Sequence, residues 1–422
     1  MTDATFRTCC IAGGGPAGIM LGFLLARAGV NVTVLEKHKD FFRDFRGDTI
    51  HPSTLQLMHE LGLLDEFLKV RHDEIRNLRV LIGDTEIQLA DFTHLPTACK
   101  FIALMPQWDF LDFLFEQGRR YPGFDLRMET EATDLVIEGD RVVGLRAVAQ
   151  GQPVEFRADL VVGADGRHSI VRERAEFQVE NLGAPMDVLW LRLSRKPDDP
   201  GQIGGYVNFG RMMVTLNRGD YWQCAFLIRK GGYDQVEARG IEAFRAEIVR
   251  IVPWLADRVG ELKDWKDISL LTVAVDRLTR WWRPGLLCIG DAAHAMSPIG
   301  GVGVNLAVQD AIAAANILAE PLRLGQLTND HLDRVQKRRT FPMKAIQLMQ
   351  TTVQKRVIDR VLGSDGPARA PLIFRLFNMF PFLRRIPARF VGIGVRPEHV
   401  RTPPYPASAA NSSAEASSAP AS

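Results

Sequence analysis

The N-terminal part of the chain carries two short apolar runs separated by glycines and a helical stretch. The first run covers residues 8–12, glycines recur over 13–18, and small and apolar residues then follow at helical spacing as far as Ala28. Residues 30–35 form the second run, which Glu36 closes. Short apolar runs bounded by glycine are typical of buried strands. Strand, turn, helix and strand in this order predict a βαβ unit with parallel strands.

Helical and strand patterns alternate further along the chain. Residues 76–100 alternate between apolar and polar positions and contain turn residues, which favours strands outside the first sheet. A helix of small residues is predicted over 302–319, and the buried-strand pattern returns at 159–163 and 286–290. Further helices are predicted over residues 108–119 and around Leu55, Met58, Leu61 and Leu64.

Between residues 185 and 275 the pattern changes to period two with hairpin signals. One hairpin is predicted from strands at 206–216 and 221–228, joined by a polar turn that contains Gly219. A long amphipathic helix is predicted over 330–361.

Composition excludes several classes of protein. The chain has 422 residues, 46% hydrophobic and 24% charged, which rules out a mostly disordered protein. The net charge of +2 predicts no nucleic-acid partner. No signal peptide is visible, no apolar run reaches membrane-spanning length, and the five cysteines are scattered, so we expect a cytoplasmic, reduced protein. The histidines and cysteines lack metal-site spacing, and no metal is predicted.

The glycines after the first strand form a dinucleotide-binding fingerprint, Gly13-x-Gly15-x-x-Gly18. The first glycine makes the tight turn, the second lets the backbone approach a pyrophosphate, and the third packs the helix against the strand. Helix N-terminal amides then face the phosphates. Glu36 lies where a carboxylate accepts ribose hydroxyls, which favours FAD or NAD over NADP. The expected cofactor-binding set in this region also includes Pro16, Ala17 and Lys37.

Two further motifs decide between FAD and NAD. A strand at 159–163 is followed by the turn Asp165-Gly166-Arg167, here called the DG turn. A strand ending at Ile289 delivers Gly290-Asp291, here called the GD motif, and a glycine-rich helix start follows at 300–305. An aspartate at a strand end can bind a polyhydroxyl chain such as ribitol, and the helix start offers amides to an electron-rich ring.

The three motifs, in this order and at these separations, resemble the single-component FAD-dependent aromatic monooxygenases of the p-hydroxybenzoate hydroxylase fold, over roughly residues 6–320. The resemblance implies FAD-binding roles for several residues. Arg46 matches the arginine that meets the pyrophosphate, and Gln107 matches a glutamine near the ribityl and adenosine portions of FAD. The further positions so implied are Asp165, Gly166, Asp291, Gly301, Gly303 and Asn305. Pro298 matches a proline whose carbonyl faces the substrate, whereas Val302 replaces a glutamine often found in the family.

The predicted fold class is therefore α/β, a Rossmann-like FAD-binding domain with an inserted antiparallel β-sheet domain and a C-terminal helical segment. The FAD-binding domain is expected at 1–75, 100–180 and 276–330, and the substrate-binding β domain at 76–99 and 181–275. A helical region follows at 331–402. Residues 403–422 are rich in Pro, Ala and Ser, which predicts a disordered tail.

The resemblance implies hydroxylation of an aromatic or conjugated small molecule by O2 through a C4a-hydroperoxyflavin, with NAD(P)H as transient co-substrate. The reductant is expected near the DG turn and the Arg46 loop, where Arg43, Arg46 and Arg167 supply positive charge. Two alternatives stay open: a flavin-dependent reductase or dehydrogenase of C=C bonds, and a non-catalytic prenyl-binding protein on the same fold.

Residues of the predicted hairpin are the candidates to face the substrate. They are Tyr206, Arg211, Trp222 and Gln223, with simple sheet packing as the alternative for each. His294 is a candidate acid or base because it follows Asp291, although a structural role beside FAD explains it equally well.

The segment 369–401 is rich in arginine and phenylalanine. Such a segment can lie on an anionic membrane surface, which would give a weak peripheral contact. The alternative, which we prefer from sequence, is a helical cap packed on the flavin domain with solvated arginines.

Overall fold

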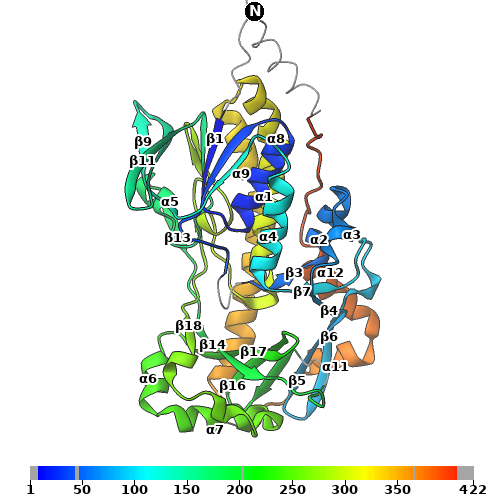
Figure 1. Ribbon diagram of the computed structural model, residues 1–422. Coiled ribbons are helices and arrows are strands. Elements are labelled where there is room, and N and C mark those ends of the chain that lie inside the picture. The colour runs from blue at the N-terminus through cyan, green and yellow to red at the C-terminus, as the bar shows by residue number, and fades with distance from the viewer. Residues whose placement is uncertain (1–7, 43–46, 201–203, 365, 406–422) are drawn as a thin grey trace, which may run out of the picture.

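The computed structural model describes residues 8–42, 47–200, 204–364 and 366–405, and two large sheets occupy its opposite ends (Figure 1). The predicted positions Arg43 and Arg46 lie outside the described residues. The α/β class predicted from sequence is confirmed.

A six-stranded sheet forms the first end of the molecule. Its strands, in spatial order, are β20 (Trp282–Arg283), β21 (Leu286–Cys288), β12 (Leu160–Gly163), β1 (Thr8–Ala12), β2 (Asn31–Leu35) and β8 (Phe124–Arg127). All neighbours pair in parallel except β20 with β21. The predicted βαβ unit is confirmed, with Cys10 opposite Thr33. The strand ends that carry Glu36, the DG turn and the GD motif therefore meet at one edge.

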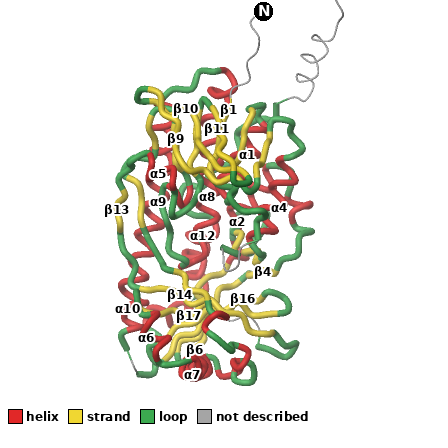
Figure 2. Tube along the Cα trace, turned by 60° about the vertical axis from the view of Figure 1, so that its left-hand side comes forward, coloured by secondary structure: helices red, strands yellow, loops and turns green. Residues whose placement is uncertain are grey.

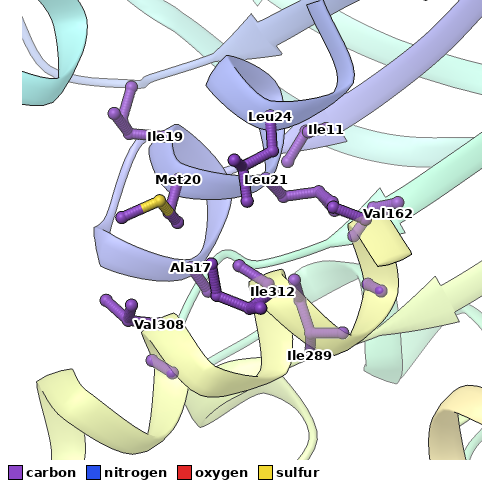
Figure 3. Packing of buried hydrophobic residues seen from close by; sticks show 14 of the residues in the cluster. Ile11, Ala17, Ile19, Met20, Leu21, Leu24, Val162, Ile289, Val308 and Ile312 are labelled. Carbon is purple, nitrogen blue, oxygen red and sulfur yellow. The ribbon is translucent and has the colours of Figure 1, made fainter. Parts of the chain in front are cut away.

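Helix α1 (Pro16–Arg27) lies between this sheet and α8 (Gly303–Leu324). Figure 3 shows Ala17 and Leu21 of α1 close to Ile312 of α8, with Val162 of β12 beyond them. By length and composition, the stretch Ile299–Leu324 could cross a membrane, which was not predicted from the sequence. However, 83% of its most apolar 18 residues are buried within the protein. Such burial is what a core helix requires.

A seven-stranded sheet forms the other end. In spatial order it contains β18 (Ser269–Leu271), β14 (Met186–Ser194), β17 (Tyr221–Arg229), β16 (Arg211–Asn217), β15 (Gly205–Asn208), β5 (Asn77–Ile82) and β6 (Thr85–Asp91). The predicted hairpin needs correction. Its first strand, 206–216, is two strands, because Phe209 and Gly210 both adopt positive φ and turn the chain between β15 and β16. The strands β5 and β6, within residues 76–99, belong to this sheet.

Helices α6 (Tyr233–Ala238) and α7 (Ile241–Ile251) cover the face of the seven-stranded sheet that points away from the six-stranded sheet (Figures 1 and 2). Phe244 and Ile248 of α7 pack there against Phe226 of β17. We call this the outer face. The inner face points toward the nucleotide-binding end.

The remaining strands form three smaller sheets. The first contains β3 (Thr49–Ile50), β7 (Ile102–Leu104) and β4 (Asp73–Ile75), and the second contains β11 (Gln152–Arg157), β10 (Arg141–Ala149) and β9 (Thr130–Glu138). In the third, β13 (Val179–Asn181) pairs with β19 (Asp276–Leu278). The remaining early helices are α2 (Pro52–Glu60), α3 (Leu64–Phe67), α4 (Gln107–Gly118) and α5 (Ile170–Arg174).

The C-terminal part begins with the predicted long helix. It runs as α9 (Asn329–Val353), a π-helical segment at Gln354–Ile358 and α10 (Asp359–Leu362). Helices α11 (Leu372–Met379) and α12 (Arg385–Gly392) follow. The chain then returns as an extended strap, residues 394–405, drawn in red beside the helices in Figure 1. The tail was expected to start at 403, but the Tyr405 N–H donates to the Arg27 carbonyl at 2.8 Å. Residues 406–422 lie outside the described residues.

Candidate active site

The fingerprint glycines lie where β1 turns into α1. Gly13 has φ +104°, and a Cβ there would collide with the Ala164 backbone. A Cβ on Gly18 would collide with the Gly13 carbonyl, so helix and strand pack closely only with glycine. Gly15, the N-cap of α1, has open space around it and provides no side-chain cap. The start of α1 is thus an open cradle of amides, the arrangement that binds phosphate.

Glu36 lies at the end of β2, directly beside this cradle. Its carboxylate accepts hydrogen bonds from the Gly14 N–H at 3.1 Å and the His38 N–H at 3.0 Å. A carboxylate has further lone pairs available for hydroxyl groups. Lys37 is different, because its side chain is 57% exposed and lies 3.8 Å from Glu131. The side chain of Lys37 therefore lies at the surface beside β9.

The DG turn and the GD motif are adjacent in space. Arg167 Nη2 lies 3.8 Å from Asp291 Oδ2, and both side chains are partly exposed. Gly166 has φ +87° and open space around it. Burial raises the pKa of Asp165, although its carboxylate accepts the Val171 N–H at 3.1 Å. Asp291 therefore lies next to the positive charge of Arg167, and both side chains remain accessible to solvent.

His294 is oriented by a buried carboxylate. Its Nε2 lies 2.6 Å from Asp310 Oδ2, and His294 and Asp310 are 1% and 0% exposed. Asp310 also accepts the Gly290 N–H at 3.1 Å and Arg339 Nε at 2.8 Å. The structure thus favours the structural role for His294 over the acid or base role, because its ring is committed to Asp310 and excluded from solvent.

The glycine-rich helix start is fixed by a network around Thr49. Gly301 has φ +62°, and a Cβ on it would collide with Thr49 Oγ1, which donates to the Gly301 carbonyl at 2.8 Å. Asn305 donates from Nδ2 to the Thr49 carbonyl at 2.9 Å, and its Oδ1 accepts the His51 N–H and Thr54 Oγ1, each at 2.8 Å. The Asn305 amide is thereby fully used inside the protein, so it positions the helix start instead of presenting its amide to a ring.

Gly303 and Pro298 lie in the same loop. Gly303 has open space around it, and no side chain caps α8. The Pro298 carbonyl, expected to face a substrate, accepts the Gly301 N–H at 3.0 Å.

Sequence reasoning missed a buried polar cluster that joins the two ends of the molecule. Asp48 accepts Gln223 Nε2 at 2.8 Å and is paired with Arg218. Arg218 Nε donates to Gln223 Oε1 at 3.2 Å. Burial raises the pKa of Asp48, whereas Arg218, Gln223 and the backbone N–H of Gln107 act in the opposite direction. No local motif marks Asp48 or Arg218, because their partners are distant in sequence.

The hairpin candidates divide between the two faces of the sheet. Tyr206 and Trp222 pack in the outer-face cluster, where the Tyr206 hydroxyl accepts Trp254 Nε1 at 3.1 Å and Trp222 Nε1 donates to Asp199 at 2.7 Å. Arg211 is paired with Glu247 of α7. These three expectations are therefore corrected: sheet packing explains them. Only Gln223 faces inward, because side chains alternate between faces along a strand.

The inner face carries a different set of side chains. Part of this face is half-buried and apolar, formed by Trp190, Met212, Val214, Leu271 and Ile299. The rest of it, Met186, Val188, Ala225 and Leu227, is at most 5% exposed and packs with Ile358 and Leu362. On the outer face, by contrast, Leu189, Met213 and Phe226 are at most 1% exposed. Ile299 directly follows Pro298, so this apolar surface reaches the glycine-rich helix start.

These features fit FAD on the structure's own geometry. Two uncapped helix N-termini have glycines with room around them, Glu36 stands at the end of β2, and Asp291 stands at the end of the strand β21 and its short extension. Within the described residues, no group of three or more His, Cys, Asp or Glu side chains could hold a metal ion.

Comparisons with known proteins agree with this site. Residues 7–349 match a family model described as an FAD binding domain. The 6-methylpretetramide 4-monooxygenase of Streptomyces rimosus is 34% identical over 91% of this chain and 93% of its own length. The structure of p-nitrophenol 4-monooxygenase from Pseudomonas putida superposes with a TM-score of 0.75, at 19% identity, over 93% of this chain and 99% of that chain.

A solved anhydrotetracycline hydroxylase from Streptomyces rimosus has a TM-score of 0.72 at 22% identity, covering 92% of this chain and 76% of that chain. At less than 25% identity, the solved structures show only the fold of this chain. The 34% identical relative also supports its activity as a monooxygenase. These names support hydroxylation and not the reductase or prenyl-binding alternatives. The chain belongs to the FAD binding domain family and is an FAD-dependent aromatic monooxygenase.

Proposed function

We propose that this chain hydroxylates a phenolic compound of several fused rings, held between the inner face of the seven-stranded sheet and the helix start at 300–305. Relatives of this family act with FAD, O2 and NAD(P)H. Bound FAD supplies the oxygen-activating chemistry, and the protein positions the ring, excludes water and places charge. The 34% identical relative, named for a pretetramide substrate, supports a multi-ring compound.

The FAD-binding residues follow from the open positions of the site. The amides at the start of α1, around Gly15, Ala17 and Gly18, take the pyrophosphate, and Pro16 sets the helix start without using a donor. Glu36 takes the ribose hydroxyls. Asp291 takes the ribityl chain, and the amide at Gly303 with the positive end of α8 stabilises negative charge on the flavin ring.

The observation that carries the substrate assignment is the difference between the two faces of one sheet. The outer face is covered by α6 and α7, and its central side chains are buried. The inner face keeps half-buried Trp190, Val214 and Met212 beside Ile299. Half-buried aromatic and aliphatic side chains with few polar groups are typical of a small-molecule site. A flat ring system fits such a surface.

Labelled dioxygen gives the decisive test. The purified holoenzyme, with NADH or NADPH and a library of phenols, naphthols and anthracene diols, is expected to oxidise the nicotinamide faster with a ligand than without. The product should carry one labelled oxygen atom. Conversion without labelled oxygen, or reductant consumption that yields only hydrogen peroxide with every phenol, would contradict hydroxylation of this class.

We further propose that the protein acts in the cytoplasm, since its five cysteines are free and buried. The helices α11 and α12 and the turn between them expose apolar side chains, among them Met379 at 66%, Phe382 at 60% and Ile386 at 68%. Arg385 and Arg389 lie in the same segment. This combination supports the weak membrane contact considered from sequence. Flotation with anionic but not zwitterionic vesicles is expected, and loss of flotation in Ile386→Ser would confirm the surface.

A further inference from the structure

A second cavity lies far from the flavin site, between α8, α9 and the C-terminal strap. Its volume is about 480 Å³, within the range of small-molecule sites. Ala313 and Ile317 of α8 form an apolar floor beside Asn316. The basic residues that line it are Arg334, Lys337, Arg338, Arg396 and Arg401, and the only acidic lining residue among the described residues is Glu398.

The acidic residue does not neutralise this cavity. Glu398 is 4% exposed and accepts Arg338 Nε at 2.6 Å and Arg339 Nη1 at 3.3 Å. Lys337 pairs with Asp333 at 2.6 Å. The guanidinium groups of Arg334, Arg396 and Arg401 have no ion pair within the described part of the chain, and the three residues are exposed. Three of the five basic lining residues therefore have no counter-ion among the described residues.

The local backbone also favours a ligand here. Arg334 lies three and four positions before Lys337 and Arg338 on α9, a spacing at which like charges on a helix repel each other. Arg396 has φ +56°, which is uncommon for a residue other than glycine and costs free energy. Asn316 anchors the strap that carries Arg396, because its amide donates to the His399 carbonyl at 2.8 Å and accepts the Arg401 N–H at 2.9 Å. A bound anion would offset both costs.

We propose that this cavity, which we call the strap site, binds a phosphate-bearing small molecule. Arginines from two elements, α9 and the strap, can bind a phosphate from different sides with paired hydrogen bonds. The floor of Ala313 and Ile317 suits an organic body attached to the phosphate. The strap site is separate from the reaction of the proposed function.

The strap site is not where the reductant works. Asn316 lies thirteen residues beyond Gly303 on α8, which corresponds to about 20 Å along a helix. Hydride transfer needs contact with the flavin, which the start of α8 is proposed to hold. The buried chain Glu398, Arg339 and Asp310 connects the strap site with the Gly290 N–H of the GD motif.

Calorimetric titration of the FAD-loaded enzyme at low ionic strength tests the proposal. Inorganic pyrophosphate and ADP are the two probes, and sodium sulfate at matched ionic strength is the reference. We expect saturable binding of one equivalent per chain. Tighter binding of ADP identifies the ligand as a nucleotide, and equal binding identifies it as an inorganic polyphosphate.

Two variants locate the binding. Arg401→Gln and Arg396→Gly should each weaken pyrophosphate binding at least tenfold, and the glycine keeps the left-handed backbone that Arg396 adopts, so the fold is preserved. Arg119→Gln removes an exposed arginine outside the cavity and should change nothing. Flavin absorbance and ligand-free NAD(P)H oxidation should match the parent in all three. Absence of saturable binding to the parent, or equal losses in Arg119→Gln, overturns the proposal.

Discussion

Gln223 of β17 donates a 2.8 Å hydrogen bond from Nε2 to Oδ2 of Asp48, which lies 175 residues earlier. Asp48 immediately precedes Thr49, the residue that holds the carbonyl of Gly301. The seven-stranded sheet and the glycine-rich helix start are thus joined by two hydrogen bonds and the peptide bond between Asp48 and Thr49. Because both Gln223 and Asp48 are buried, this connection fixes the inner face relative to the proposed flavin ring.

Two neighbouring glycines should respond differently to alanine. Gly301→Ala places a Cβ against Thr49 at φ +62° and should lower the free energy of unfolding by at least about 2 kcal/mol. Gly303→Ala has space and a helical position, so it should melt like the parent but bind FAD about tenfold more weakly. Thermal melting of apoprotein and flavin titration separate the two effects. Equal melting temperatures for both variants would contradict this assignment.

Asp291→Ala should weaken FAD binding by about 10- to 100-fold, because it removes a charged acceptor from the proposed ribityl contact. Fluorescence titration of apoprotein with FAD measures the change. Asp333→Ala is the matched control, since Asp333 forms a helix-surface pair with Lys337. An unchanged FAD affinity in Asp291→Ala would show that the GD motif serves another purpose.

Substitutions on opposite faces of the seven-stranded sheet should affect different quantities. Val214→Phe fills the inner face and should raise the KM for the aromatic substrate about tenfold, with little effect on melting. Tyr206→Phe removes the hydroxyl that accepts from Trp254 on the outer face and should cost about 1 kcal/mol of stability. Its KM should stay unchanged. The reverse pattern would place the substrate on the outer side.

Arg167→Gln should slow reduction of the flavin by NAD(P)H more than reduction by dithionite, because only the nicotinamide nucleotide uses a docking cation. Stopped-flow absorbance under anaerobic conditions measures both rates. Arg174→Gln, which alters an arginine 3.8 Å from Asp134, is the control. Equal slowing by the two reductants would indicate that Arg167 only orients Asp291.

His51 should make the fold sensitive to acid. Burial lowers its pKa to about 4, while its ring Nδ1 lies 2.8 Å from the Val391 carbonyl and donates to it in the neutral form. The unfolded chain then binds a proton that the folded chain excludes between pH 6.5 and 4, so stability falls as the pH is lowered through this range. The loss from pH 7.5 to 5 should be about 2 kcal/mol.

Denaturant titrations at the two pH values check this contribution. His51→Gln should show a smaller difference in stability between them than the parent, whatever its absolute stability. His168→Gln, an exposed histidine, should keep the parent's difference. A pH dependence that is identical in His51→Gln and the parent would assign the acid sensitivity to other groups.

The nucleotide-binding end could be predicted from sequence because its signals are local. Gly13, Gly15 and Gly18 lie in one short segment. Close backbone contacts require glycine at positions 13 and 18, and Gly15 leaves open space at the start of α1. Parallel strands separated by a helix then place Glu36 and Asp291 at one sheet edge, since the connection rules allow few other arrangements. FAD binding could therefore be predicted from the sequence alone.

The substrate side was decided by tertiary structure. Alternation makes neighbouring residues such as Trp222 and Gln223 face opposite sides, but only pairing with α7 on one side and Asp48 on the other determines which side is which. The resemblance to the family likewise suggests that Asn305 contacts the flavin. In the structure, however, its side-chain amide forms hydrogen bonds with Thr49, His51 and Thr54. Strand register and long-range hydrogen bonds arise from packing between distant segments, and no local pattern in the sequence encodes them.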